Sequence, residues 1–159
     1  MSGKSIKVKN IRTASGKKYA INVLMPGEYQ YLDRLYQFNY VPDELIGCTH
    51  IKTCGDDKLI SENKFCFSFE IDEPATVGII FADKFPVIPN WLRGFEASRH
   101  KITRTDSMPS NLKGYFTVFY KKFPKGIVEI NGCSPESMLT EEFISTGGSG
   151  YCMYTVVVC

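Results

Sequence analysis

The stretch Phe65–Ile71 constrains the fold more than any other, because its aromatic residues alternate with small or polar ones. Its three phenylalanines and its isoleucine would share one face of an extended strand, since side chains alternate across a strand. The following run, Ala75–Phe81, is almost wholly apolar. We therefore expect a first strand with one buried face, a second strand covered on both faces, and a hairpin that joins them in an antiparallel sheet.

Turn-rich segments divide the rest of the chain into about ten short strands, and no long segment has a helical period. This spacing predicts an all-β fold, an antiparallel β-sandwich, with a β-barrel as the alternative. We expect one domain over residues 1–159, a length that suits a single core. The expected strands are Ser5–Ile11, Tyr19–Leu24, Leu35–Asn39, Thr49–Thr53, Phe65–Ile71, Ala75–Phe81, Lys101–Thr105, Tyr115–Lys122, Gly126–Ile130 and Tyr151–Cys159.

The last strand is rich in β-branched residues, so we expect it in the centre of a sheet. We expect one helical turn, at Asn90–Phe95. The glycine-rich segment Gly147–Gly150 precedes the last strand and is expected to be a flexible approach to it. It lacks the Lys-Ser or Lys-Thr pair and the following helix of a phosphate-binding loop.

The charge balance argues against nucleic acid as a partner. The chain has 19 Lys and Arg against 17 Asp and Glu, a net charge of +2, which is too small to drive binding to a phosphate backbone. The local clusters of basic residues are expected to be solvated faces of strands. No apolar run reaches the roughly 18 residues of a membrane helix, and the start of the chain lacks the apolar core of a signal peptide.

Six cysteines leave the oxidation state open. They are Cys48, Cys54, Cys66, Cys133, Cys152 and Cys159, which could form three bridges in fifteen pairings. Disulfides and reduced structural thiols are equally compatible with a domain of this size. One pair is excluded: Cys152 and Cys159 bracket the last strand on opposite faces and should not bond each other.

Catalytic groups are sparse. Only His50 and His100 could serve as the usual base, and Cys48 lies too close to His50 in sequence for a thiol and imidazole pair from different elements. We therefore predict that the chain is not an enzyme and needs no cofactor.

We also predict no metal site. Zinc could be built from Cys48, His50, Cys54 and Asp56, but this spacing matches no common zinc pattern. Acidic pairs in turns, Asp56 with Asp57 and Asp72 with Glu73, could serve calcium but are ordinarily solvated.

Binding has more support, centred on Trp91, the only tryptophan. A tryptophan can stack on sugar rings, and Asp83, Asn90 and Arg93 nearby could hydrogen-bond to hydroxyl groups. The alternative is that Trp91, which follows Pro86-Val87-Ile88-Pro89, folds over the end of the core as a plug. We take the loop Asp83–Phe95 as the predicted ligand site.

Motifs over about four fifths of the chain resemble a β-sandwich module found at the ends of large secreted bacterial proteins, among them polysaccharide-degrading enzymes. The motifs are Tyr31-x-Asp33-Arg34-x-Tyr36-x-Phe38, Val41-Pro42-x-x-Leu45-x-Gly47, Ile51-x-Thr53-x-x-Asp56-Asp57-Lys58, Phe67-Ser68-Phe69, Ala75-Thr76-Val77, Pro89-x-Trp91-Leu92, Phe95, Tyr120–Gly126 and Met153-Tyr154. The resemblance implies an extracellular accessory module that holds a carbohydrate or spaces and stabilises its parent protein. The six cysteines and the basic segment before Met25 depart from that pattern.

We predict a non-catalytic module that recognises a carbohydrate or a glycosylated partner through loops at one end of the sandwich. The alternative, from another class, is a structural or protein-interaction domain of a larger assembly with no small ligand. An exposed strand edge or apolar patch would serve this second role.

Overall fold

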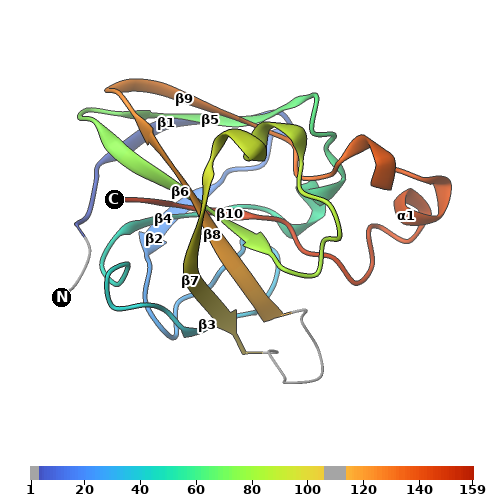
Figure 1. Ribbon diagram of the computed structural model, residues 1–159. Helices are drawn as coiled ribbons and strands as arrows, with labels where there is room; N and C mark the ends of the chain where they lie inside the picture. The colour runs from blue at the N-terminus through green and yellow to red at the C-terminus, as the bar shows by residue number, and fades with distance from the viewer. Residues whose placement is uncertain (1–3, 106–113) are drawn as a thin grey trace.

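The computed structural model describes residues 4–105 and 114–159, which form ten strands in two antiparallel sheets (Figure 1). The smaller sheet has the order β1-β5-β9 and the larger one the order β2-β4-β10-β6-β8-β7-β3. The predicted antiparallel all-β sandwich is confirmed, and one sheet is curled into a half-barrel. The strands are β1 Val8–Thr13, β2 Ala20–Val23, β3 Phe38–Tyr40, β4 Thr49–Lys52, β5 Phe65–Ile71, β6 Ala75–Ala82, β7 Glu96–Arg104, β8 Tyr115–Phe123, β9 Gly126–Asn131 and β10 Thr155–Val158.

Short helices fill some of the connections. They are the 3-10 helices η1 Gly55–Leu59, η2 Asn90–Gly94 and η4 Glu136–Met138, and one helix α1 Glu141–Ser145. The predicted helical turn after Pro89 is thus confirmed as η2. None of the helices in the described part of the chain is long and apolar enough to cross a membrane.

The curl of the larger sheet brings its far edge back towards its beginning. The rings of Phe38 in β3 and His50 in β4 meet edge to face with centroids 5.0 Å apart, although four strands separate β3 from β4 in the sheet order. The amide of Asn22 in β2 donates to the carbonyl of Tyr29, which pairs with Gln37 immediately before β3. The larger sheet therefore has a second, inner packed face.

Strand β6 is covered on both faces, as predicted, because it lies in the middle of the larger sheet. Gly78 lies in register with His50 across β10, and the packing around Gly78 is tight. A Cβ there would lie 2.7 Å from a methyl carbon of Val157 and 2.9 Å from one of Val118. A side chain at Gly78 has no room unless these neighbours move.

The prediction that β5 and β6 form a hairpin within one sheet is wrong. Strand β5 pairs with β1 and β9 in the smaller sheet, whereas β6 pairs with β10 and β8 in the larger one. The connection Asp72-Glu73-Pro74 therefore turns a corner between sheets. The physical reason is that an apolar face on each strand is buried better when the strands belong to opposing layers than when they are neighbours in one layer.

The predicted single buried face of β5 also needs correction. Phe65 is 38% exposed, whereas Cys66 and Phe67 are both fully buried. The pairing of β5 with β9 shifts register between Phe65 and Phe67, as a β-bulge does. This irregularity breaks the strict alternation that the sequence pattern predicted.

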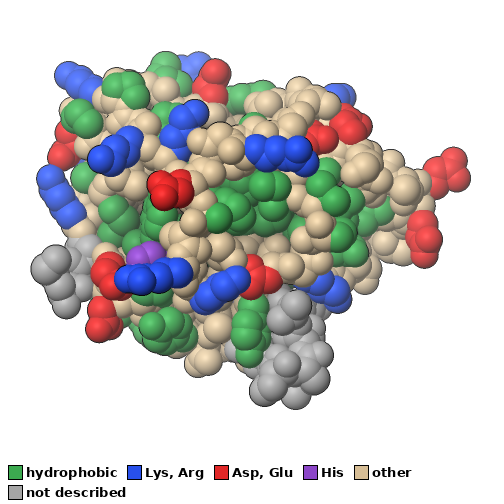
Figure 2. Space-filling model, viewed as in Figure 1, with side chains coloured by type: hydrophobic (Ala, Val, Ile, Leu, Met, Phe, Trp, Pro, Cys, Tyr) green, Lys and Arg blue, Asp and Glu red, His purple; other side chains and the backbone are tan. Residues whose placement is uncertain are grey.

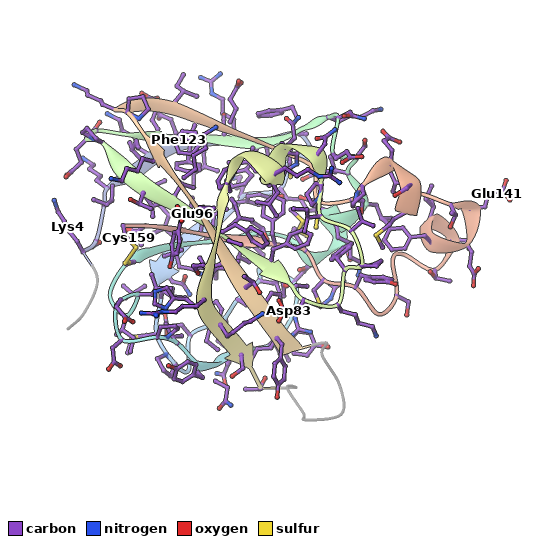
Figure 3. All side chains as sticks on the ribbon, in the orientation of Figure 1. Lys4, Asp83, Glu96, Phe123, Glu141 and Cys159 are labelled. Atoms are coloured by element: carbon purple, nitrogen blue, oxygen red, sulfur yellow. A yellow bond between two sulfur atoms is a disulfide. The ribbon has the colours of Figure 1, made fainter. Side chains whose placement is uncertain are left out.

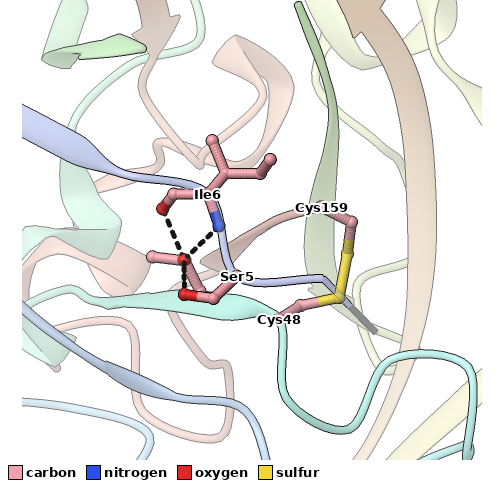
Figure 4. Close-up of a disulfide and its surroundings, with 5 residues drawn as sticks. Ser5, Ile6, Cys48 and Cys159 are labelled. Atoms are coloured by element: carbon pink, nitrogen blue, oxygen red, sulfur yellow. Dashed lines mark hydrogen bonds between the residues drawn. A yellow bond between two sulfur atoms is a disulfide. The ribbon is translucent and has the colours of Figure 1, made fainter. Parts of the chain in front are cut away.

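Strand β10 is central, as predicted, since it lies between β4 and β6. Cys159 at its end forms a disulfide with Cys48 before β4 (Figure 4). The expectation that Cys152 and Cys159 do not bond each other is confirmed. The remaining four cysteines are buried thiols.

Several predicted strands have different bounds in the structure, β3 and β7 among them. Strand β7 begins at Glu96, well before the predicted Lys101, because its solvent-facing polar residues hid the strand pattern. Strand β3 begins at Phe38, and Leu35, the predicted first residue, is 87% exposed. The half-barrel is closed by a shorter β3 and a longer β7 than the sequence indicated.

Candidate functional site

Trp91, the centre of the predicted ligand site, packs over the end of the sandwich core. Its indole Nε1 donates to the Gly132 carbonyl at 2.9 Å. Its ring meets the rings of Phe95 and Tyr154 edge to face, with centroids 5.8 and 5.7 Å apart. The side chain is half-buried, so these contacts leave part of the ring at the surface.

The other three predicted site residues have different neighbours. Asp83 lies beyond the end of β6, away from η2 (Figure 3), and its carboxylate accepts from Lys101 at 2.8 Å and Thr117 at 2.5 Å. The Asn90 side chain donates to Asn63 at 2.8 Å, and Arg93 is exposed. Asn90 and Arg93 share η2 with Trp91, whereas Asp83 is held by β7 and β8. The role of these four residues in ligand binding stays a prediction.

The face that carries β7 and the η2 loop is apolar in its middle (Figure 2). Lysine and arginine side chains border this apolar area in the same view. Aromatic rings packed against the core from this part of the fold include Phe95, Phe119 and Phe123. The apolar area is thus the outer edge of the core.

A second candidate site is a cavity of about 180 Å³ between the loop before β3, helix η1 and the segment before β10. Three tyrosines and three basic residues contribute to its lining. These six are Tyr31, Tyr36, Tyr151, Arg34, Lys58 and Arg104. The combination of aromatic rings with convergent polar groups is typical of a ligand pocket.

Arg104 is held in the wall of this cavity at the end of β7. Its side chain is only 1% exposed, and its guanidinium lies 3.8 Å from the centroid of the Tyr36 ring. It also donates to the sulfur of Cys152 at 3.3 Å. Cation–π stacking on Tyr36 compensates in part for the loss of water around the charge.

Lys58 of η1 is the second buried cation of the cavity, with 9% of its surface exposed. Its aliphatic stem lies under the glycine-rich segment. A Cβ on Gly148 would approach Lys58 Cε to 2.8 Å, and the φ of Gly148 is +69°. Both facts require glycine at this position. Burial lowers the pKa of Lys58 below its usual value.

Arg34, the third cation that lines the cavity, is paired with two carboxylates. Its guanidinium lies 2.8 Å from a carboxylate oxygen of Asp33 and 2.8 Å from one of Asp56. Burial opposes the ionisation of Asp33, but hydrogen bonds from the Cys54 thiol and the backbone N–H groups of Gly55 and Asp56 outweigh it. These bonds lower the pKa of Asp33.

Asp33, Cys54 and Asp56 place their ligand atoms within 4.8 Å of one another, the spacing of a small metal site. The Asp33 carboxylate already accepts the hydrogen bonds just described, and Arg34 bridges it to Asp56. These interactions use both oxygens of Asp33 and one oxygen of Asp56. Arg34 therefore already supplies a positive charge to both carboxylates.

Two of the groups considered for catalysis, Cys48 and His50, are engaged elsewhere, whereas His100 is half-buried beside the ring of Tyr120. Cys48 is in the disulfide, so neither a thiol nucleophile nor the zinc set that included it is available. His50 is fully buried, with Nδ1 2.6 Å from the Asn22 amide oxygen. Burial, with a smaller effect of Lys52, lowers the pKa of His50 to about 3. His50 therefore has no route to a substrate at the surface.

No family model matches the chain, and a search of curated proteins found no match to it. Solved structures do match. One is a β-glucuronidase from glycoside hydrolase family 2, with a TM-score of 0.68 and 16% identity over 93% of this chain. Another is a glycoside hydrolase family 138 enzyme targeting pectin rhamnogalacturonan II, with a TM-score of 0.56 and 11% identity over 97% of this chain.

The chain spans 14% and 16% of the lengths of these two neighbours. At such low identity the likeness shows a shared fold. That fold is a β-rich one that occurs within carbohydrate-active enzymes, which agrees with the coarser part of the resemblance noted from the sequence. The likeness to these two structures assigns no catalytic role to this chain.

Sequence reasoning missed the cavity, although one signal for it was present. Arg104 is two residues from Ile102 in the same strand, so both should face the core. The sequence offered no comparable signal for Lys58, which follows two aspartates in a turn. Only the fold brings Lys58, Arg104 and the glycine-rich segment together.

Proposed function

We propose that this chain is a non-catalytic domain that binds carbohydrate as part of a larger protein. The observation that carries the proposal is the cavity lined by Tyr31, Tyr36 and Tyr151 together with buried hydrogen-bond donors. Tyrosine rings and convergent donors are the groups with which proteins hold sugar rings and hydroxyls. A volume of about 180 Å³ suits one sugar ring rather than an extended chain.

The comparisons support this proposal at the level of fold. Both neighbours are glycoside hydrolases, and their names refer to a glucuronide and to pectin. The engagement of Cys48 and His50 in the core supports a role in binding rather than catalysis. The Cys48–Cys159 disulfide supports an oxidising, extracellular location.

The test is a broad glycan array with the parent protein and two variants. Ser149→Phe places a bulky side chain on an exposed residue that lines the cavity, and Trp91→Ala removes the indole of the other candidate surface. We expect Ser149→Phe to lose at least tenfold in affinity and Trp91→Ala to retain binding. Thermal melts of all three proteins show that each is folded.

The opposite pattern, loss in Trp91→Ala alone, would assign the site to the loop predicted from the sequence. A folded parent that binds no glycan would contradict the proposal. The alternative would then be a protein-interaction domain, which the exposed Ile21, Val23 and Met25 at edge strand β2 favour. A molecular mass that rises with concentration would support that alternative.

A further inference from the structure

The cavity holds an uncompensated positive charge. Arg34 is paired with Asp33 and Asp56, but Lys58 forms no ion pair with any residue in the ranges 4–105 and 114–159. None of those residues forms a hydrogen bond with its ammonium either. Lys58 is nevertheless more than nine-tenths buried.

A lysine side chain that is this buried and has no counter-ion is unusual in a folded protein. Removing a charge from water costs several kcal/mol, and native proteins normally offset this cost with an ion pair or hydrogen bonds. Lysine is almost never so buried without a partner. Lys58 is therefore suited to pair with an anion on the side that lines the cavity.

The surrounding groups favour the same class of ligand. The guanidinium of Arg104 lies in the same cavity wall as Lys58 and stacks on the Tyr36 ring. Ser149 and Gly150 also contribute to the lining, so neutral donors stand beside the charges. Asp33 and Asp56, the two carboxylates beside Arg34, are both engaged by it.

We infer that the cavity binds an acidic sugar, a uronic acid residue whose carboxylate pairs with Lys58. The inference rests on the proposed function and specifies its ligand class. The carboxylate supplies the missing counter-ion, and the ring of the sugar occupies the space beside Tyr151. A neutral sugar would leave the ammonium unpaired, so charge and not ring shape decides the preference.

The experiment uses matched pairs of ligands that differ only in oxidation at C6. Calorimetric titrations compare methyl glucuronide with methyl glucoside, and methyl galacturonide with methyl galactoside, at constant ionic strength. The same titrations are made with Lys58→Met, which keeps an unbranched stem without the charge. Lys122→Met, an exposed lysine outside the cavity, is the matched control.

We expect the uronides to bind at least tenfold more tightly than the neutral glycosides. Lys58→Met should lose this preference, whereas Lys122→Met should keep it. If neutral and acidic glycosides bind equally to the parent, the charge inference is overturned while the proposed function stands. If neither kind of sugar binds, both are overturned.

Inorganic sulfate is titrated as a further ligand, because any small anion could pair with a buried cation. Sulfate binding as tight as that of the uronides would identify a general anion site and overturn the inference. Lys58 can also be followed directly in the parent by NMR of ¹³C-labelled lysine. A pKa of Lys58 that rises on addition of methyl glucuronide supports the pairing, and an unchanged value opposes it, even if Lys58→Met fails to fold.

Discussion

The single side chain of His50 makes the stability of this fold depend on pH. Its ring lies between Asn22 of β2 and Phe38 of β3, where the curl of the sheet excludes water. Burial lowers its pKa from 6.5 to about 3, so the neutral imidazole is the form that the folded protein accepts. The unfolded chain binds this proton more readily, and acid therefore favours unfolding.

The expected result is a free energy of unfolding that falls as pH drops below about 6.5 and goes on falling towards 3. Inside that window one proton contributes about 1.4 kcal/mol per pH unit. Urea unfolding at pH 5, 6 and 7.5 measures it, with His50→Gln as the comparison. The difference between the two proteins should shrink with acid, and parallel profiles would contradict the assignment.

Element η2 acts as a cover on the end of the sandwich. Trp91 contributes both an apolar ring against Tyr154 and a hydrogen bond to Gly132. Trp91→Ala should therefore lower the free energy of unfolding by roughly 2–4 kcal/mol, since both contacts are lost. Trp91→Phe keeps an aromatic ring and should lose about 1 kcal/mol. Chemical denaturation measures both changes.

Arg93→Ala in the same element is the control, because Arg93 is exposed and its replacement should change stability by no more than about 0.5 kcal/mol. If Trp91→Ala were as stable as Arg93→Ala, the tryptophan would be free of the core. Such a result would favour the stacking surface predicted from the sequence. The stability of η2 therefore bears on the choice between the two candidate sites.

For the whole molecule, the disulfide is the longest covalent constraint. Cys48 and Cys159 are separated by 111 residues, so the bond closes a loop that includes most of both sheets. Loop-closure entropy predicts a stabilisation of roughly 4 kcal/mol for such a loop. The variant with both Cys48→Ala and Cys159→Ala should lose about that amount in chemical denaturation.

Reductant provides the matched control for this prediction. The parent should lose stability in reductant, whereas the double variant should not respond, because the other four cysteines are thiols. A double variant that still responds would show that a different pair is bonded. The comparison therefore tests both the size of the effect and the pairing.

Local pattern was sufficient to predict the ten strands, the central place of β10 and the turn at η2. In each case the signal lay in neighbouring residues: the apolar run of β6, the β-branched run of β10, and the proline and glycine that flank Trp91. Such patterns depend on side-chain alternation and turn chemistry, which act over a few residues. They could not show whether β5 and β6 pair in one sheet or face each other across two.

The tertiary structure decided that question and also decided the candidate site. Residues far apart in sequence, Lys58, Arg104 and Gly148, meet only because the larger sheet curls and the segment before β10 folds over η1. The cost of burying the two charges depends on that enclosure and not on the residues next to them in sequence. The sequence by itself therefore determined the strands and the aromatic core, while the charged cavity follows from the way the sheets close.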